Sequence, residues 1–154
     1  MTKTDTPAFC LSSVSPAAYA EIAAVWEASG RATHHFITEA ELQFYRPLLQ
    51  QEYLWLMELT CARDAQGKVL GFSGTADGKL EMLFLHPSAR GRGIGKSLLQ
   101  HAIRHQRVAK VDVNEENEMA LGFYQHLGFK VISHSPLDSM GMPHPILHLG
   151  LAKD

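Results

Sequence analysis

The residues with the clearest chemical potential lie together, where a short apolar segment at residues 80–85 runs into a loop rich in glycine and basic side chains. The loop alternates the two types: Arg90, Gly91, Arg92, Gly93, Ile94, Gly95, Lys96. From Ile94 onward the apolar residues recur at helical spacing, so a helix is expected to begin there. The first N–H groups of a helix lack backbone partners, the helix dipole adds positive charge, and glycines allow a ligand to approach closely. This stretch therefore predicts a site for a phosphate group.

Two nucleotide-binding motifs can be tested against this loop by counting. A Walker A loop needs a glycine five positions before the glycine of Gly95-Lys96-Ser97, and that position holds Arg90. Gly91 is one residue too close. The dinucleotide fingerprint needs two residues between its second and third glycines, whereas Gly93 and Gly95 are separated by one. The spacing therefore favours neither an ATP-binding loop nor a dinucleotide site.

The segment from Arg90 to Gly95 resembles the pyrophosphate loop for acyl-coenzyme A in the GNAT N-acetyltransferase superfamily, whose pattern is Arg/Gln-x-x-Gly-x-Gly/Ala. A second segment resembles the later motif of that family: Asn117-x-x-Ala120-x-x-Phe123-Tyr124-x-x-x-Gly128-Phe129. The two motifs are independent and correctly separated. Three further segments resemble the YjaB-like bacterial subgroup: Ala32-Thr33-His34-x-Phe36, Val113-Asn114-Glu115-x-Asn117-Glu118 and Gly141-x-Pro143-x-Pro145-x-Leu147. The resemblance therefore spans nearly the whole chain.

This resemblance implies a fold and an activity. The fold is α+β, with a GNAT-type mixed, mostly antiparallel sheet of about seven strands and helices on both faces, in a single domain over residues 1–154. The activity is transfer of an acetyl group from acetyl-CoA to a primary amine, carried by a small molecule or a protein lysine. No catalytic cysteine is evident, so direct attack in a ternary complex is expected. The alternative is a non-catalytic acyl-CoA-binding sensor on the same fold.

By the same resemblance, a splayed or bulged strand at residues 82–85 polarises the thioester carbonyl and pairs with the pantetheine amides. The residues implied in binding the cosubstrate are Leu83, Phe84, Leu85, Arg90, Gly91, Arg92, Gly93, Ile94, Gly95, Lys96, Asn117 and Tyr124. No metal is expected. His101 and His105 have a spacing that can suit zinc, but the glutamate of the metalloprotease motif is missing, which favours a solvated helix face.

Three side chains are candidates for proton transfer. A lysine-type amine has a pKa of ~10.4 and arrives charged, so a carboxylate is expected to take its proton, directly or through water. Glu81 at the start of the apolar segment and Asp112 in the next strand are both candidates, and both also fit exposed strand positions. Tyr124 matches the family tyrosine that protonates the leaving thiolate, although its place on an apolar helical stripe alone indicates a core residue.

The candidate residues for binding the acceptor come from loops. His34 and Phe36 lie before the second predicted helix, where the family places acceptor-binding groups, and His144 lies between two prolines. The alternative is loop surface for the two histidines and the core for Phe36.

Periodicity and capping residues define the elements that must position these groups. Ser15 caps a first helix that Gly30 ends, and Thr38 with Glu41 forms a capping box for a second, which Pro47 is expected to end or kink. Further helices are expected at 94–107 and at 117–127, the second with Asn117 as its N-cap. Strands are expected at 9–14, 54–62, 69–75, 80–85, 109–113, 129–133 and 146–151. The crossover helix makes strands 80–85 and 109–113 parallel, and strand 146–151 is expected to close the sheet.

Composition narrows the function classes. The chain has 154 residues, of which 45% are apolar and 19% charged, and its net charge of −2 gives no support for a nucleic-acid partner. No apolar run approaches the ~20 residues of a membrane span. Residues 1–7 are polar and lack the apolar core of a signal peptide, which favours the cytoplasm. A monomer or a homodimer is expected.

Overall fold

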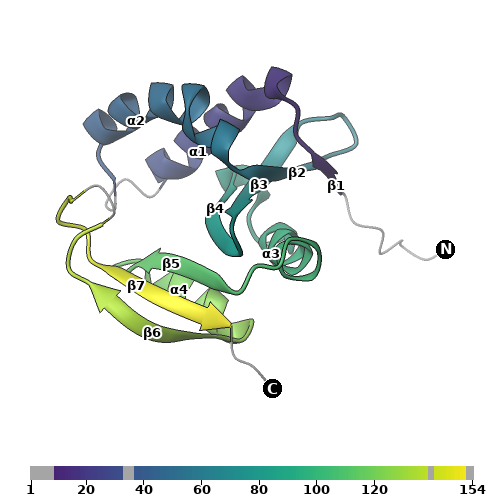
Figure 1. The fold of residues 1–154 in the computed structure, drawn as a ribbon. Coiled ribbons are helices and arrows are strands. Elements are labelled where there is room, and N and C mark those ends of the chain that lie inside the picture. Colours follow the sequence, from purple (N-terminus) through teal and green to yellow (C-terminus); the bar gives the residue numbers. More distant parts are fainter. Residues whose placement is uncertain (1–8, 33–36, 139–140, 152–154) are drawn as a thin grey trace.

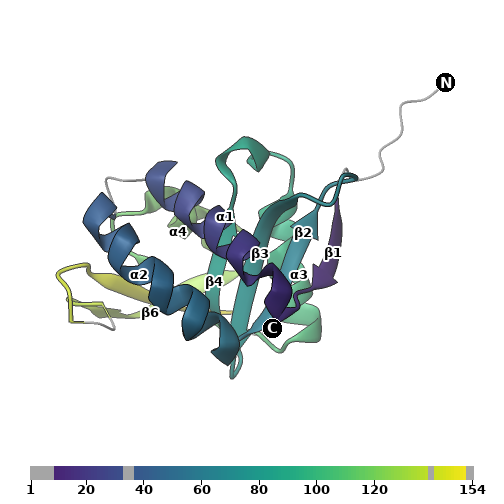
Figure 2. The same ribbon diagram turned by 90° about the horizontal axis from the view of Figure 1, so that it is seen from above.

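The computed structural model describes residues 9–32, 37–138 and 141–151. All strands of these residues belong to one seven-stranded sheet with the order β1-β2-β3-β4-β5-β7-β6. Helices α1 and α2 cover one face, and α3 and α4 cover the other (Figures 1 and 2). The predicted α+β architecture is therefore confirmed, as is the parallel pairing of the strands on either side of α3.

The elements follow in this order: β1 (Cys10–Ser13), η1 (Pro16–Ala18), α1 (Tyr19–Ala32), α2 (Glu39–Gln51), η2 (Tyr53–Leu56), β2 (Glu58–Arg63), β3 (Val69–Ala76), β4 (Lys79–Leu85), η3 (Pro87–Ala89), α3 (Ile94–His105), β5 (Lys110–Asn114), α4 (Glu118–His126), β6 (Phe129–Ser135) and β7 (Ile146–Leu151).

Three local predictions are wrong. Gly30 does not end the first helix, because α1 continues to Ala32. The strand expected from residue 54 begins only at Glu58, because Leu54 is fully buried in a 3₁₀ turn while the Trp55 indole donates to the carbonyl of Gln50. Of the two outcomes expected at Pro47, an end of the helix is excluded: α2 continues to Gln51, with the fully buried Leu49 anchoring its last turn in the core. The last strand, β7, does not close the sheet, since it lies between β5 and β6.

The core consists of three clusters. One lies between α1, α2 and the sheet, and Phe72 is at its centre, with no exposed surface. A second lies under α3 and α4, where Leu99 and Tyr124 pack on β5 and β7. A third fills the space between α3 and the first strands and includes Leu98. The sheet is therefore packed on both faces, which fixes the positions of β4 and β5 between the two helical layers.

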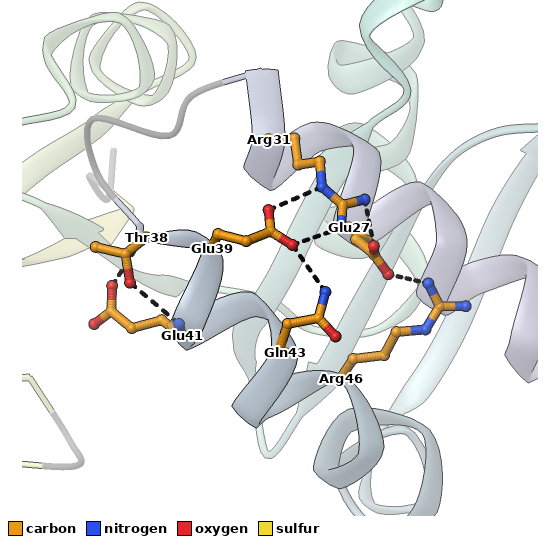
Figure 3. A network of polar contacts seen from close by, with 7 residues as sticks. All are labelled: Glu27, Arg31, Thr38, Glu39, Glu41, Gln43 and Arg46. Atoms are coloured by element: carbon orange, nitrogen blue, oxygen red, sulfur yellow. Dashed lines mark hydrogen bonds and ion pairs between the residues drawn. The ribbon is translucent and has the colours of Figure 1, made fainter.

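A polar network joins the ends of α1 and α2 (Figure 3). Arg31 is paired with Glu27 on its own helix and reaches Glu39 on α2 with nitrogen–oxygen distances of 3.0 and 2.8 Å. Hydrogen bonds from Arg31 and then Gln43 lower the pKa of Glu39 to about 2. Arg46 on α2 forms a second ion pair with Glu27 on α1. These contacts hold α1 and α2 together over the sheet.

The start of α2 carries the capping box that the sequence predicts. Glu41 N–H donates to the Thr38 hydroxyl at 3.1 Å, and Thr38 N–H donates to the Glu41 carboxylate at 2.8 Å. The Glu41 carboxylate also lies 3.0 Å from Nε2 of His144, which precedes β7. Hydrogen bonds from the Thr38 backbone and from His144 hold the pKa of Glu41 below its usual range.

Replacing Glu41 by Gln is expected to destabilise the protein by about 1 kcal/mol at pH 7, because a charged cap is lost at the helix N-terminus. A carboxyl whose pKa is lower in the folded state stabilises above its unfolded pKa of ~4.3, and that contribution is lost as the pH falls through the lower folded value. Urea titrations of both proteins should therefore differ at pH 7 and converge toward pH 3. A constant difference would mean that the ionised carboxylate is not the source of the stabilisation.

Candidate active site

The sheet opens where β4 and β5 part. Their parallel pairing covers only Lys79 with Lys110 and Leu80 with Val111, whereas β4 remains paired with β3 as far as Leu85. Beyond Leu80 the β5-facing backbone edge of β4 is therefore directed into a gap in the sheet. Backbone N–H and C=O groups in such a position are available to an extended ligand with amide groups of its own.

Glu81 occupies a bulge at this point. Leu80 pairs with Thr75 and Met82 pairs with Gly74, so Glu81 has no partner residue on β3. A bulge redirects the strand and its side chains and is frequent beside active sites. Residues 82–85 are thus splayed away from β5, as expected, while the bulge itself lies one residue earlier, at a candidate catalytic carboxylate.

The gap between the strands leads into a cavity of about 160 Å³, several times the ~30 Å³ that a water molecule occupies in the liquid. Its walls come from β4, β5 and α4, and they contain Glu81, Leu83, Phe84, Asp112, Asn117 and Tyr124 among other residues. Sequence motifs far apart in the chain are therefore brought together around one cavity. Leu85 lies beyond its lining, at the end of β4.

Tyr124 projects from α4 into the cavity wall and is 7% exposed. Its ring packs edge-on against Phe123 and Phe129, with centroid distances of 5.2 and 5.8 Å. Burial raises the pKa of the Tyr124 hydroxyl, so the group stays protonated at neutral pH. A phenol with a pKa above that of a thiol, ~8.5, is the weaker acid, and the hydroxyl is best suited to donate a hydrogen bond to a developing thiolate.

Asn117 serves a structural role that the sequence predicts. It is the N-cap of α4, and its side-chain oxygen accepts a hydrogen bond from Ala120 N–H at 3.1 Å. The same residue lines the cavity. The cap therefore fixes the end of α4 that faces the gap between β4 and β5.

The two candidate carboxylates differ in their surroundings. The Glu81 side chain is 39% exposed, and its nearest ion-pair partner is Lys79, at 4.0 Å. Asp112 is held between Lys79, at 2.6 Å, and Nδ1 of His148, at 2.7 Å. Burial raises the pKa of Asp112, but the hydrogen bonds from Lys79 and His148 outweigh it and leave the pKa below its usual range. The Asp112 carboxylate is thus already occupied by two hydrogen-bond partners, whereas the Glu81 carboxylate is freer to accept a proton.

The glycine-rich loop has the backbone that an anion site requires. Gly91 and Gly93 adopt φ values of 81° and 79°, a left-handed conformation that favours glycine. Gly93 is the N-cap of α3 and offers no side chain to the first N–H groups of the helix. Gly95, by contrast, is buried against Phe123 and Leu85. Two glycines therefore open the backbone toward solvent, and the third allows the helix to pack.

The three cations of the loop, Arg90, Arg92 and Lys96, are exposed around the start of α3. Replacing Arg90 and Arg92 together by Ala is expected to weaken acetyl-CoA binding roughly 10- to 100-fold, since hydrogen bonds to charged groups contribute about 1.5–3 kcal/mol each. Calorimetric titration with acetyl-CoA measures the change. A matched double variant of Arg104 and Arg107, at the far end of the same helix, should bind normally. Equal affinity for all three proteins would exclude this loop as the phosphate site.

The structure describes one of the three candidate residues for binding the acceptor. His34 and Phe36 lie outside the described residues. His144 is 27% exposed and paired with Glu41, so it joins the segment before β7 to the start of α2. Sequence reasoning missed Lys79, Ser135 and His148, which form one hydrogen-bonded row with Asp112. These residues come from three strands, and only the strand order places β7 beside β5.

Two features are absent from residues 9–32, 37–138 and 141–151. No cluster of three histidine, cysteine or acidic side chains there could hold a metal ion. None of the described helices is long and apolar enough to span a membrane.

A sheet that parts between two parallel strands, followed by a glycine-rich loop at the N-terminus of a helix, is the architecture expected of an acyltransferase. Residues 50–131 match the family model of the acetyltransferase (GNAT) domain. The chain belongs to this family, and it is an N-acetyltransferase. Among curated proteins it is similar to the peptidyl-lysine N-acetyltransferase YjaB of Salmonella typhimurium (strain LT2), with 36% identity over 132 residues that cover 84% of this chain and 88% of the relative.

Solved structures agree with this assignment. The solution structure of apo-form YjaB from Escherichia coli superposes with a TM-score of 0.81 and 29% identity, and the match covers 95% of this chain and 99% of that one. The PaiA N-acetyltransferase from Thermoplasma acidophilum, solved in complex with coenzyme A, has a TM-score of 0.72 at 19% identity, and the match covers 94% of this chain and 99% of that one. The second similarity extends to the fold alone.

Proposed function

We propose that this enzyme transfers the acetyl group of acetyl-CoA to the ε-amino group of a protein lysine. The observation that carries the proposal is the cavity between β4 and β5, which has Tyr124 in its wall and the carboxylates of Glu81 and Asp112 in its lining. A lysine side chain is a cation on a long apolar stem, and it suits an apolar cavity with acidic groups in its lining. The relatives named peptidyl-lysine N-acetyltransferases support this choice of acceptor.

The residues present fit acetyl-CoA as the acetyl donor. The pyrophosphate would lie on the open backbone of Gly91 and Gly93 and on the first N–H groups of α3. The pantetheine arm would run along the unpaired edge of β4, with Leu83 and Phe84 in contact. Bound in this way, acetyl-CoA supplies a thioester carbonyl that the amine can attack.

Each polar group around the cavity then has a role. Glu81 takes the proton of the lysine ammonium, because it stands on the bulge with its carboxylate partly exposed. Asp112, held ionised by its hydrogen bonds to Lys79 and His148, contributes negative potential rather than proton transfer. Tyr124 donates a hydrogen bond to the sulfur as the carbon–sulfur bond breaks.

A panel of acceptors tests the proposal. The protein is incubated with acetyl-CoA and lysine peptides, the same peptides with Arg in place of Lys, polyamines or free amino acids, and both free thiol and acceptor mass are recorded. Acetylation confined to lysine peptides would support the proposal. Acetylation of small amines alone would overturn the protein-lysine acceptor. Acetyl-CoA binding without thiol release for any acceptor would instead favour a sensor.

A further inference from the structure

A row of hydrogen bonds lies on the face of β5, β7 and β6 that is turned away from α4. Asp112 on β5 and His148 on β7 are direct cross-strand partners, and Ser135 ends β6. His148 Nδ1 lies 2.7 Å from Asp112 Oδ1, and His148 Nε2 lies 2.7 Å from Ser135 Oγ. The row therefore has the order carboxylate, imidazole, hydroxyl.

The charge of Asp112 sets the direction of these hydrogen bonds. Lys79 and His148 keep the Asp112 carboxylate ionised, and an ionised carboxylate only accepts hydrogen bonds. Nδ1 of His148 must then carry a proton and donate it to Asp112, and in the neutral imidazole Nε2 is left as the acceptor for the Ser135 hydroxyl. This is the arrangement in which an imidazole increases the nucleophilicity of a serine oxygen.

The same geometry argues against His148 as the base of acetyl transfer. The acetyl site lies between β4 and β5, whereas β7 and β6 lie one and two strands beyond β5, at roughly 4.8 Å per strand. The free lone pair of His148 faces Ser135 on β6, on the side away from the cavity. The lone pair of His148 Nε2 is therefore available to the Ser135 hydroxyl and not to an amine in the cavity.

We propose that Ser135 is an activated nucleophile that takes the acyl group of small activated esters or thioesters. Ser135 Oγ forms a bond to the carbonyl carbon while the hydroxyl proton passes to His148 Nε2. The bond from that carbon to the leaving oxygen or sulfur then breaks, and the leaving group receives the proton from His148. Water hydrolyses the acyl-serine by the same route. The Asp112 and His148 side chains are each 32% exposed, so solvent and small reagents reach the row.

A fluorophosphonate probe, which phosphonylates activated serines, tests the proposal on the full chain without acetyl-CoA. Intact mass and peptide mapping follow the rate at Ser135 in the wild type and in Ser135→Ala, His148→Gln and Ser133→Ala. Ser133 is the matched control, since it lies on the same strand directly opposite His148. General-base assistance typically contributes at least 10²-fold, but Lys79 shares Asp112, so we expect labelling of the wild type about tenfold faster than that of His148→Gln.

The labelling results distinguish an activated Ser135 from an ordinary serine. Labelling at Ser135 in the wild type and in Ser133→Ala, with loss in Ser135→Ala and slowing in His148→Gln, supports the proposal. No label at Ser135 in the folded wild type overturns it, as does equal labelling of His148→Gln when circular dichroism shows that this variant is folded. Because the probe does not require acetyl-CoA, these results are independent of the test of lysine acetylation.

Discussion

The Tyr124→Phe variant is expected to lose about 100-fold or more in kcat, within the usual range for removal of an acid–base group, while its affinity for acetyl-CoA changes less than about twofold. The substitution deletes one hydroxyl from the cavity wall and keeps the ring that packs against Phe123 and Phe129. Burial keeps this hydroxyl protonated, so its hydrogen bond is available when the thiolate forms. Steady-state kinetics and calorimetry on the same preparation measure the two effects.

Phe123→Leu provides a matched control for the packing around Tyr124. Phe123 lies next to Tyr124 on α4 and contacts it through its ring, but it carries no hydroxyl. This variant should therefore keep most of its turnover if the hydroxyl is what matters. An equal loss in both variants would assign Tyr124 to the core, and normal turnover in Tyr124→Phe would remove it from catalysis.

The second large effect is expected for Glu81→Gln, which should lower kcat/KM by about 100-fold at pH 7 because the proton acceptor is lost. The remaining activity then depends on acceptor that is already deprotonated, a fraction that rises about tenfold per pH unit toward the amine pKa of ~10.4. The difference from the wild type should therefore shrink to a few-fold near pH 9.5. Initial rates across pH 7–9.5 on one lysine peptide test this.

Asp112→Asn is the comparison that distinguishes the two carboxylates. Asp112 is occupied by Lys79 and His148, so its loss should reduce activity less and without the convergence at high pH. If Asp112→Asn converges with the wild type at high pH and Glu81→Gln does not, the roles assigned to these two residues are reversed.

Much of the fold could be predicted because local signals agree with one another. The capping box of Thr38 and Glu41, the N-cap Asn117 and the glycine-rich loop all appear in the structure where the sequence places them. Propensity failed where tertiary packing competed with it. Residues 54–56 are as apolar as a strand, but burial of Leu54 between the helices holds them in a 3₁₀ turn.

The site was predictable only in part, for a related physical reason. Motifs identify candidate residues with a fixed local geometry, such as the loop before α3 and Tyr124 on α4. The environment of Asp112 depends on a lysine 33 residues away and a histidine 36 residues away. Such pairs follow from strand order, and here β7 pairs with β5 instead of lying at the edge.

The short pairing between β4 and β5 has a consequence for how the protein holds itself together. Within the described residues, the backbone ladder between the four N-terminal strands and the three C-terminal ones contains only two residue pairs, so the sheet consists of two blocks with a weak seam. Helix α3 bridges the seam, because its neighbouring residues Leu98 and Leu99 belong to different core clusters. A ligand that hydrogen-bonds along β4 while contacting β5 and α4 would close the seam. The gap that we propose for the acyl donor is thus also where folding is least cooperative. Binding of the donor is expected to stabilise the junction between the two blocks and to make unfolding more cooperative.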